Sequence, residues 1–289
     1  MESLPNIRDI KRRIQAIDNI QHVTRAMQMV AASKLRRAQS QLWAARPYAH
    51  KITEVVGRLA LAPQAQELSL VAPREVNKVG YVLITGDRGL AGAYNANLIN
   101  LTVDYLNKEK RPVALVPVGG KGAQYFLKRQ VEILVHYEEI DDEPDLSQAR
   151  DLARQLMGFY LSRELDEVNL IYARFHSALR HEVRVERFLP VVTPLLKSTE
   201  EVEYIYEPEP KGILEAILPR YCEMRVFQAL LEAKASEHGA RMVAMESATS
   251  NAGEVIEQLT LSFNKARQAA ITTEIVEIAT SAEALKAQE

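Results

Sequence analysis

The segment ITGDRGLAGAYN, from Ile84 to Asn95, holds the residues that are best placed to do chemistry. An apolar run leads into Asp87 and Arg88, and a glycine flanks this pair on each side. The end of a strand is where α/β proteins place phosphate-binding loops and metal-binding carboxylates. The segment nevertheless matches neither G-x-x-x-x-G-K-[ST] nor G-x-G-x-x-G. The pattern therefore favours turns over a nucleotide loop, and Asp87 could equally be a helix N-cap.

Other patterns of catalytic or metal-binding residues are weak. A second glycine cluster, GGKG from Gly119 to Gly122, has no serine or threonine after its lysine. The six histidines are dispersed without metal-ligand spacing, and no serine lies in a G-x-S-x-G elbow. The single cysteine, Cys222, excludes an internal disulfide and a cysteine-based zinc site. The sequence predicts no metal site, no cofactor and no covalent catalysis.

Two long segments almost free of proline and glycine lie at the two ends of the chain. From Tyr221 to Glu289 there is no proline and there are only two glycines, while Asn6 to Arg46 contains neither residue type. Apolar residues recur every three or four positions in both segments, so each is expected to form an amphipathic helix far longer than the average one. Such helices bury their apolar stripes most economically against each other. We therefore expect a shaft of two paired helices.

The middle of the chain, from about residue 76 to 195, has a different period. Short apolar runs alternate with amphipathic segments, which predicts strands and helices in a largely parallel sheet. The expected strands are VGYVLITG, PVALVPVGG, VEILVHYEEI and VNLIYARF, with VRVERFLPV as an antiparallel edge strand. The expected fold class is α/β: a long coiled coil of the terminal helices plus a small doubly wound, mainly parallel α/β domain. The expected boundaries are 1–60 and 211–289 for the shaft and 76–208 for a Rossmann-like body.

The charge of the chain is distributed unevenly. Residues 1–59 carry eleven Lys and Arg against four Asp and Glu, whereas residues 220–289 carry seven against ten. Opposite charges favour the association of the two helices and set their orientation, but they add little to the stability of the pair. The basic clusters IKRR and KLRR could instead contact nucleic acid or anionic lipid, although neither is interleaved with aromatic residues. No apolar run is long enough to span a bilayer, and the first residues lack the apolar core of a signal peptide.

Three segments closely resemble the signature segments of the F-type ATP synthase gamma subunit family. They are AIDNIQHVTRAMQMVAASKLRRAQ, YVLITGDRGLAGAYN and RMVAMESATSNAGEVIEQLTLSFNKARQAAITTEIVEIATSAEAL. The resemblance covers both ends and the body in the right order, which is essentially the whole chain. Ala91 and Ser281 depart from a cysteine and a glycine that are frequent in the family, so neither position is given a specific role.

This resemblance implies a non-catalytic rotor in a proton-transporting F-type ATP synthase. In the family the terminal helices form an antiparallel coiled coil, and its tip enters a hexamer of three alpha and three beta subunits. The foot contacts a ring of membrane c subunits, with the epsilon subunit alongside. Rotation driven by ion flow cycles the catalytic beta subunits through ATP synthesis or hydrolysis. No cofactor and no nucleic acid are implied, and the membrane is contacted only through the c ring.

The resemblance also indicates a source and a set of site residues. Because the chain has neither a chloroplast-type insertion nor a presequence, it is expected to be bacterial and peripheral to the cytoplasmic face of the cell membrane. Arg267, Gln268 and Thr272 match polar contacts to a beta-subunit loop, with Met27 on the opposing helix of that zone. Tyr206, Glu207 and Glu209 match the foot segment that meets the c ring. For the tip we expect a low-friction bearing of small apolar residues, namely Ile275, Ile278, Ala279, Ala282 and Leu285.

Two other interpretations stay open. An α/β enzyme with a nucleotide site at Asp87 and Arg88 would use the long helices as a dimerising stalk. It would bind nucleotide as an isolated chain, which the rotor interpretation predicts to be negligible. A membrane or nucleic-acid tether that uses IKRR and KLRR would show strongly salt-dependent binding.

Overall fold

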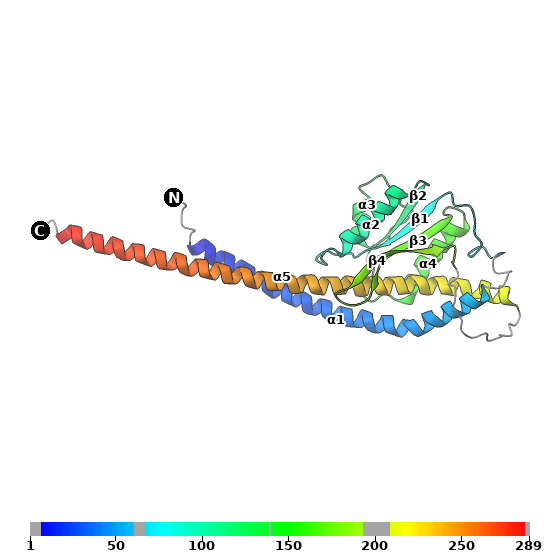
Figure 1. The fold of residues 1–289 in the computed structure, drawn as a ribbon, viewed down its shortest axis with the longest axis horizontal. Coiled ribbons are helices and arrows are strands. Elements are labelled where there is room, and N and C mark those ends of the chain that lie inside the picture. Colours follow the sequence, from blue (N-terminus) through cyan, green and yellow to red (C-terminus); the bar gives the residue numbers. More distant parts are fainter. Residues whose placement is uncertain (1–6, 61–66, 139, 193–208, 287–289) are drawn as a thin grey trace. The chain divides into compact units, whose positions relative to one another are not determined.

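The computed structural model describes residues 7–60, 67–138, 140–192 and 209–286 (Figure 1). Two very long helices bracket a set of shorter elements. In chain order the elements are α1 (Ile7–Leu59), β1 (Val79–Ile84), α2 (Tyr94–Lys108), β2 (Val113–Val118), α3 (Gly120–Phe126), α4 (Leu146–Leu161), β3 (Glu167–Phe175), β4 (His181–Leu189) and α5 (Pro210–Lys286). Within the described ranges, no helix is long and apolar enough to cross a membrane.

The chain divides into two compact units. The end unit consists of Met1–Met29 and Ala244–Glu289, and the body unit of Val30–Val243. Both α1, with 53 residues, and α5, with 77 residues, run through the two units. Each helix forms as the scarcity of glycine and proline predicts, and each continues through its single internal proline, Pro47 or Pro219. The domain boundaries expected from the sequence stay a prediction.

A four-stranded sheet in the order β2-β1-β3-β4 forms the centre of the body unit. β1 pairs in parallel with β2 and with β3, from Val79 opposite Val113 and from Val79 opposite Glu167. β4 pairs with β3 in antiparallel fashion, as expected for an edge strand. The α/β class with a mainly parallel sheet between long terminal helices is therefore confirmed.

The expected strand VEILVHYEEI is wrong. Among the described residues of this run, the pairing with β2 consists of two isolated bridges, Leu115 with Ile133 and Val118 with Tyr137. Leu115 donates to Glu132 and accepts from Leu134, so a parallel ladder would next need the amide of residue 117 as a donor. Residue 117 is proline, which has no N–H, and the ladder stops there.

Helices cover both faces of the sheet. Val79, Tyr81 and Leu83 of β1 point to one face, where they pack with residues of α2 and α3 such as Leu98 and Phe126. The other face, which includes Val82 and Ile84, packs against α4 and against parts of α1 and α5. Figure 1 shows α2 and α3 on the side of the sheet opposite to α5. This two-sided cover is the doubly wound arrangement that the sequence predicted.

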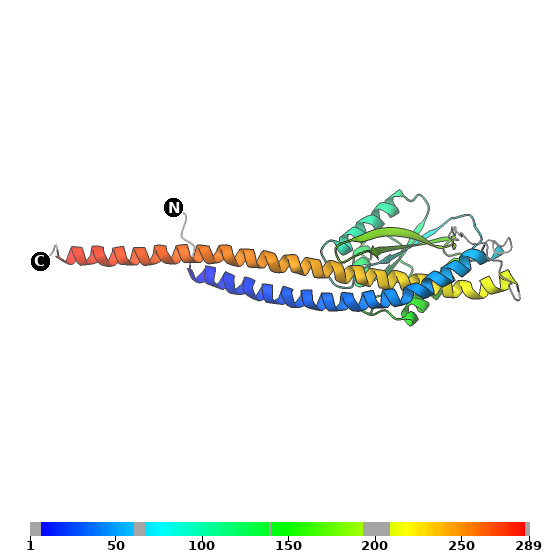
Figure 2. The ribbon, with the colours of Figure 1, turned by 60° about the horizontal axis from the view of Figure 1, so that its bottom comes forward.

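The two long helices also pack directly against each other in the body unit. Leu35, Ala38 and Leu42 of α1 form a buried cluster with Leu231 and Ala235 of α5. Figures 1 and 2 show α1 and α5 side by side here, in views that differ by a 60° rotation. Small and branched apolar residues at three- and four-residue spacing allow this close packing.

Candidate functional site

In the end unit the first part of the candidate site is the seam between α1 and α5. Gln21 Nε2 donates to the backbone oxygen of Thr249 over 3.3 Å, and Thr249 Oγ1 donates to Thr24 Oγ1 over 2.8 Å. A Cβ atom at Gly253 would lie 2.9 Å from Gln21 Nε2. Gln21 therefore reaches further along α5 than Thr24 does, so that the helices run antiparallel. These hydrogen bonds fix the register of the pair in a seam that is otherwise packed by apolar residues.

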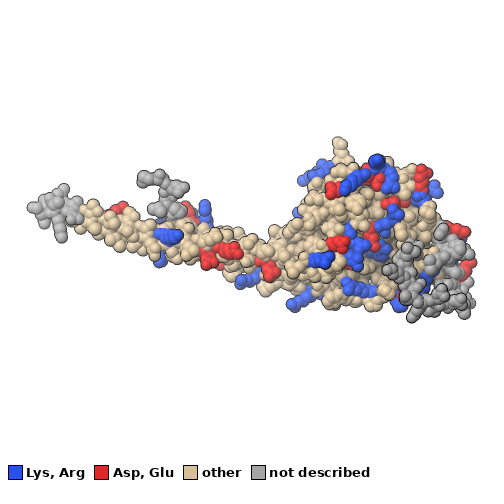
Figure 3. Space-filling view, viewed as in Figure 1, with Lys and Arg blue, Asp and Glu red and all other residues tan. Residues whose placement is uncertain are grey.

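The last described turns of α5 have a different surface. The buried or half-buried stripe of α5 continues to Ala266 and Ala269, and every residue from Ala270 to Ala282 is exposed. Ile275 is 60% exposed and Ile278 is 64% exposed, which is unusual for large apolar side chains. Figure 3 shows this stretch as mainly uncharged surface. An exposed apolar patch of this kind marks a surface for another macromolecule.

The hydroxyl groups of this stretch are turned inward to the helix itself. Thr272 Oγ1 donates to the backbone oxygen of Gln268 over 2.9 Å, and Thr280 Oγ1 donates to that of Val276 over 2.8 Å. Ser281 bonds the residue four positions earlier in the same way. Because these donors are already used, what they present outward is mainly methyl and methylene groups. The surface from Ala270 to Ala282, called the bare tip below, therefore offers few hydrogen-bond donors, and its charged groups are the exposed carboxylates of Glu274 and Glu277.

The structure brings only some of the predicted contact residues together. Arg267 and Gln268 are exposed at the start of the bare tip, and Thr272 lies one turn further. Met27 is not near them. Since Thr24 bonds Thr249, the antiparallel register places Met27 beside residues before Thr249, roughly 25 Å or more from Arg267 along the helix. The expectation that Met27 lies opposite Arg267 on the other helix is corrected by this register.

The remaining predicted site residues lie at the ends of the described ranges. Ile275, Ile278, Ala279 and Ala282 are exposed on the bare tip, and the side chain of Leu285 lies outside the described part. Tyr206 and Glu207 also lie outside the described residues. Glu209 is exposed just before α5, and its backbone oxygen accepts from Ile213 over 3.2 Å.

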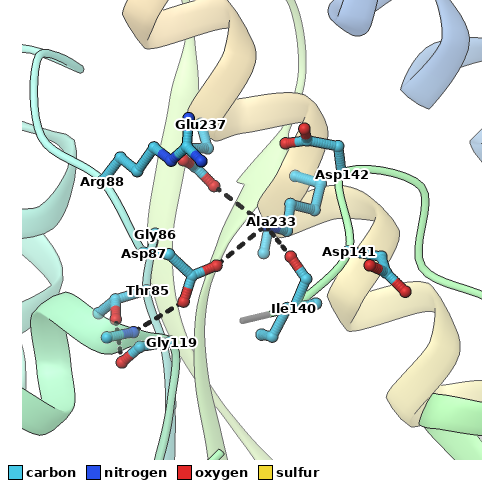
Figure 4. A network of polar contacts seen from close by, with 12 residues as sticks. Thr85, Gly86, Asp87, Arg88, Gly119, Ile140, Asp141, Asp142, Ala233 and Glu237 are labelled. Atoms are coloured by element: carbon cyan, nitrogen blue, oxygen red, sulfur yellow. Dashed lines mark hydrogen bonds and ion pairs between the residues drawn. The ribbon is translucent and has the colours of Figure 1, made fainter. Parts of the chain in front are cut away.

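In the body unit the second part of the candidate site is a buried charge cluster of Asp87, Lys234, Glu237 and Arg241. Lys234 Nζ lies 3.6 Å from both Asp87 Oδ2 and Glu237 Oε2, and it donates to the backbone oxygen of Ile140 over 2.8 Å. Arg241 donates to Glu237 over 2.7 Å. Figure 4 shows Asp87, Glu237 and Ile140 turned toward one point. The alternating charges neutralise one another, and the side chains of Lys234 and Glu237 are only 5% exposed.

Glycines allow the loop after β1 to approach α5 and α3 this closely. A Cβ atom at Gly86 would lie 2.7 Å from Glu237 Oε1. Gly119 has a φ of +105°, and a Cβ there would lie 2.2 Å from the backbone oxygen of Thr85. Asp87 Oδ1 accepts the amide of Gly120 over 2.9 Å, so Asp87 joins the loop to the first turn of α3. The glycine clusters of the sequence are thus packing and turn residues.

His238 extends the polar contacts of α5 to a second loop. It is 1% exposed, and its Nε2 lies 3.6 Å from Asp142 Oδ1. Asp142 also accepts from Lys34 of α1 over 2.5 Å, while Arg37 of α1 donates to Glu143 over 3.0 Å. Burial lowers the pKa of His238 to about 4, although the carboxylates of Glu237 and Asp142 oppose that shift. His238 is therefore neutral near pH 7.

This geometry does not favour an enzyme site at Asp87. Both oxygens of Asp87 already have partners within the body unit, and the described residues contain no group of three or more His, Cys, Asp or Glu that could hold a metal. The cluster instead fastens the loop after β1 to α5. Two of the three basic residues in KLRR, Lys34 and Arg37, are likewise paired within the protein.

Sequence analysis missed Lys234, Glu237 and Arg241. Their signal is a set of charges at three- and four-residue spacing, in LLEAKASEHGARMV, inside a segment that is otherwise apolar. Charged residues on the inner side of a long helix need partners. The sequence could have pointed to Asp87 as one of these partners, because no other role for it had a complete motif.

The similarity to known proteins extends over nearly the whole chain. The family model described as ATP synthase matches residues 6–285. The ATP synthase gamma chain of the bacterium Moorella thermoacetica is 60% identical over 283 residues, which is 98% of this chain and 100% of the relative. The chain belongs to the ATP synthase gamma chain family. As a gamma chain it is a non-catalytic subunit, and the ATPase is the complex.

Solved ATP synthase structures contain chains of similar fold. The central-stalk and c-ring structure of the Tetrahymena thermophila mitochondrial ATP synthase has a chain that is 28% identical, with a TM-score of 0.61. The alignment covers 78% of this chain and 99% of that one. A chain of the Euglena gracilis mitochondrial ATP synthase is 20% identical, with a TM-score of 0.67 and coverage of 97% and 95%. The gamma chain fold therefore extends over both the long helices and the body.

Proposed function

We propose that this gamma chain is the rotor shaft of an F-type ATP synthase, with α5 as the element that carries torque. The observation that supports this most directly is the change in surface along α5. Between Leu214 and Ala240 it is clamped by buried apolar packing and the charge cluster, whereas from Ala270 to Ala282 it is exposed and makes few directional contacts. A shaft needs both a fixed part and a part that slides.

The proposed partners follow from this division. The bare tip turns inside a ring of three alpha and three beta subunits, and the body and foot meet the epsilon subunit and the c ring at the cytoplasmic face of the bacterial membrane. Glu209, with Tyr206 and Glu207 before it, forms the contact with the c ring. Rotation then cycles the catalytic beta subunits, and the chain itself makes no contact with the bilayer.

Arg267 and Gln268 are the residues proposed to transmit the rotational position of the shaft to the beta subunits. They are the last strongly polar donors before the bare tip, and both are exposed. A guanidinium and a carboxamide can form directional hydrogen bonds to a beta-subunit loop, and Thr272, whose hydroxyl is already used, contributes shape. The bearing surface consists of Ile275, Ile278, Ala279, Ala282 and Leu285. Met27 is proposed as a separate contact lower on the shaft, since the register separates it from Arg267.

The test uses the assembled complex. Replacing Arg267 and Gln268 together with alanine should lower ATPase turnover by about tenfold, the effect of losing one charge-assisted hydrogen bond, without loss of assembly. Asn264 and Lys265, also a carboxamide and a cation and both exposed, provide the matched control one turn earlier. Their alanine double variant should keep normal turnover. Equal turnover in both double variants would remove Arg267 and Gln268 from the coupling mechanism.

A further inference from the structure

A hollow of about 560 Å³ in the body unit lies between α4, α5 and α1. Arg150 and Arg154 of α4 and Arg220 of α5 line it, together with Glu223 of α5. The three arginines face one cavity from two helices. A hollow of this size lies within the range of small-molecule sites in proteins.

The charges around this hollow do not balance. Among its lining residues Glu223 is the one carboxylate, so three guanidinium groups leave an excess of two positive charges. Glu223 accepts from Arg150 Nε over 3.4 Å, and it lies 3.6 Å from Arg154 Nε. Both distances are long for a charge-assisted hydrogen bond. Since each guanidinium carries five N–H donors, one shared carboxylate leaves most of them available to a ligand.

Apolar side chains form the other part of the lining. Tyr48 of α1 is 51% exposed and Leu146 of α4 is 40% exposed, although both are large. Met224 adds a buried apolar wall. An exposed aromatic ring beside several arginines suits a ligand that has an anionic end and a planar or apolar end.

We infer that this hollow binds an organic phosphate. Its phosphate groups lie on Arg150, Arg154 and Arg220, and its planar or apolar part lies against Tyr48. A phosphate monoester or polyphosphate supplies the two or more negative charges that the arginines leave unmatched, and guanidinium groups bind phosphate oxygens in pairs. This site is separate from Asp87 and Arg88 and from the coupling surface of α5, and it does not depend on the rotor function. Nucleotide binding by the isolated chain, expected to be negligible for a rotor, would then occur at this hollow, so the Arg88→Gln variant is needed to distinguish it from a nucleotide site in the loop after β1.

Titration calorimetry of the purified full chain tests this with two probes, pyrophosphate and ATP. Both should bind saturably, and ATP should bind more tightly because only ATP has a ring to stack on Tyr48. Arg150→Gln and Arg220→Gln should each weaken both probes by about tenfold, the expected effect of losing one charge-assisted hydrogen bond. Tyr48→Ala should weaken ATP and leave pyrophosphate unchanged. Glu223→Gln, which removes the competing carboxylate, should tighten both.

Arg88→Gln is the matched control, since it removes an exposed arginine of the loop after β1 and should leave both affinities unchanged. Circular dichroism of every variant checks that the fold is kept. The inference fails if neither probe binds saturably to the wild-type chain, or if Arg150→Gln/Arg220→Gln binds as tightly as wild type. It also fails if Arg88→Gln alone abolishes binding, because the nucleotide would then occupy the loop after β1.

Discussion

Two parts of the helix α5 differ in how they are held: the clamped part around Lys234–Arg241 is fixed by buried ion pairs, whereas the bare tip is exposed. Between Lys234 and Arg241 the helix buries charges and pairs each with a partner from a loop or from its own next turn. From Ala270 to Ala282 every residue is exposed, and hydroxyl groups there bond the backbone of the same helix. Buried ion pairs fix one geometry because any displacement leaves a charge without a partner. Apolar surface contributes burial energy that changes little with the angle of a partner.

The comparison predicts that the clamp is far more sensitive to substitution than the tip. Lys234→Met should lower the free energy of unfolding of the full chain by about 3–5 kcal/mol, the usual cost of removing one partner of a buried ion pair. Asp87 would lose the cation 3.6 Å from its Oδ2, and the backbone oxygen of Ile140 would lose its donor. Urea unfolding measures this change.

Lys265→Met supplies the control, because Lys265 is exposed on the same helix. It should change the free energy of unfolding by well under 1 kcal/mol, as most surface substitutions do, to within about 0.5 kcal/mol. If the two variants unfolded at the same urea concentration, the charge cluster would contribute nothing to holding the loop on α5.

A second difference between the two parts is pH dependence. Since the pKa of His238 is about 4 in the folded chain and about 6.5 when unfolded, the unfolded state binds more protons between these values. The contribution of His238 is therefore fully present above pH 6.5 and is lost as the pH falls toward 4, by up to about 3 kcal/mol. His238→Gln should flatten this part of the stability curve. Identical slopes for wild type and variant between pH 4 and 6.5 would contradict the assignment.

Sequence patterns predicted the parts of this molecule that depend on local rules. The scarcity of breakers gave both long helices, and the alternation of apolar runs gave β1, β2, β3 and the antiparallel β4. The strand expected around Ile133 failed because its partner residue is Pro117, and an apolar run does not reveal its neighbour's missing donor.

The candidate site divides in the same way. The special surface of Arg267, Gln268 and the bare tip could be predicted locally, because the terminal sequence is rich in small and apolar residues and has few charges. The pairing of Asp87 with Lys234 joins residues 147 positions apart, and no local pattern carries that information. The position of Met27 was mistaken for a similar reason, because the register of two helices depends on contacts such as Thr24 with Thr249.

A smaller effect is expected at the bare tip. Ile278→Val keeps an apolar surface and should leave rotation and ATPase turnover of the assembled complex unchanged. Ile278→Arg should slow rotation by roughly ten- to a hundredfold, because a guanidinium forms a directional bond at some angles that must break at others, at about 1.5–3 kcal/mol for a charge-assisted bond. Single-molecule rotation measures both. Equal rates for valine and arginine would show that the tip does not slide against a close wall.

The smallest functional effect should come from locking the seam of the end unit. Thr24 Oγ1 and Thr249 Oγ1 are 2.8 Å apart, so the double variant Thr24→Cys/Thr249→Cys places two sulfur atoms within reach of a disulfide. Oxidation should join the two positions within one chain, which a shift in mobility on a non-reducing gel detects. If α1 and α5 turn as one rod, the locked complex should keep ATPase turnover within about twofold of the reduced one, a change of less than 0.5 kcal/mol.

The reduced double variant and each single variant separate the effect of the bond from that of the substitutions. A tip that needed α1 and α5 to slide or unwind past each other would lose turnover on oxidation and recover it on reduction. Because Thr24 and Thr249 lie on facing sides of the two helices, that result would mean that α1 and α5 move against each other during rotation, and not only against the surrounding subunits. Retained turnover in the oxidised form limits the moving surface to the outside of the pair, where the exposed residues of the bare tip lie.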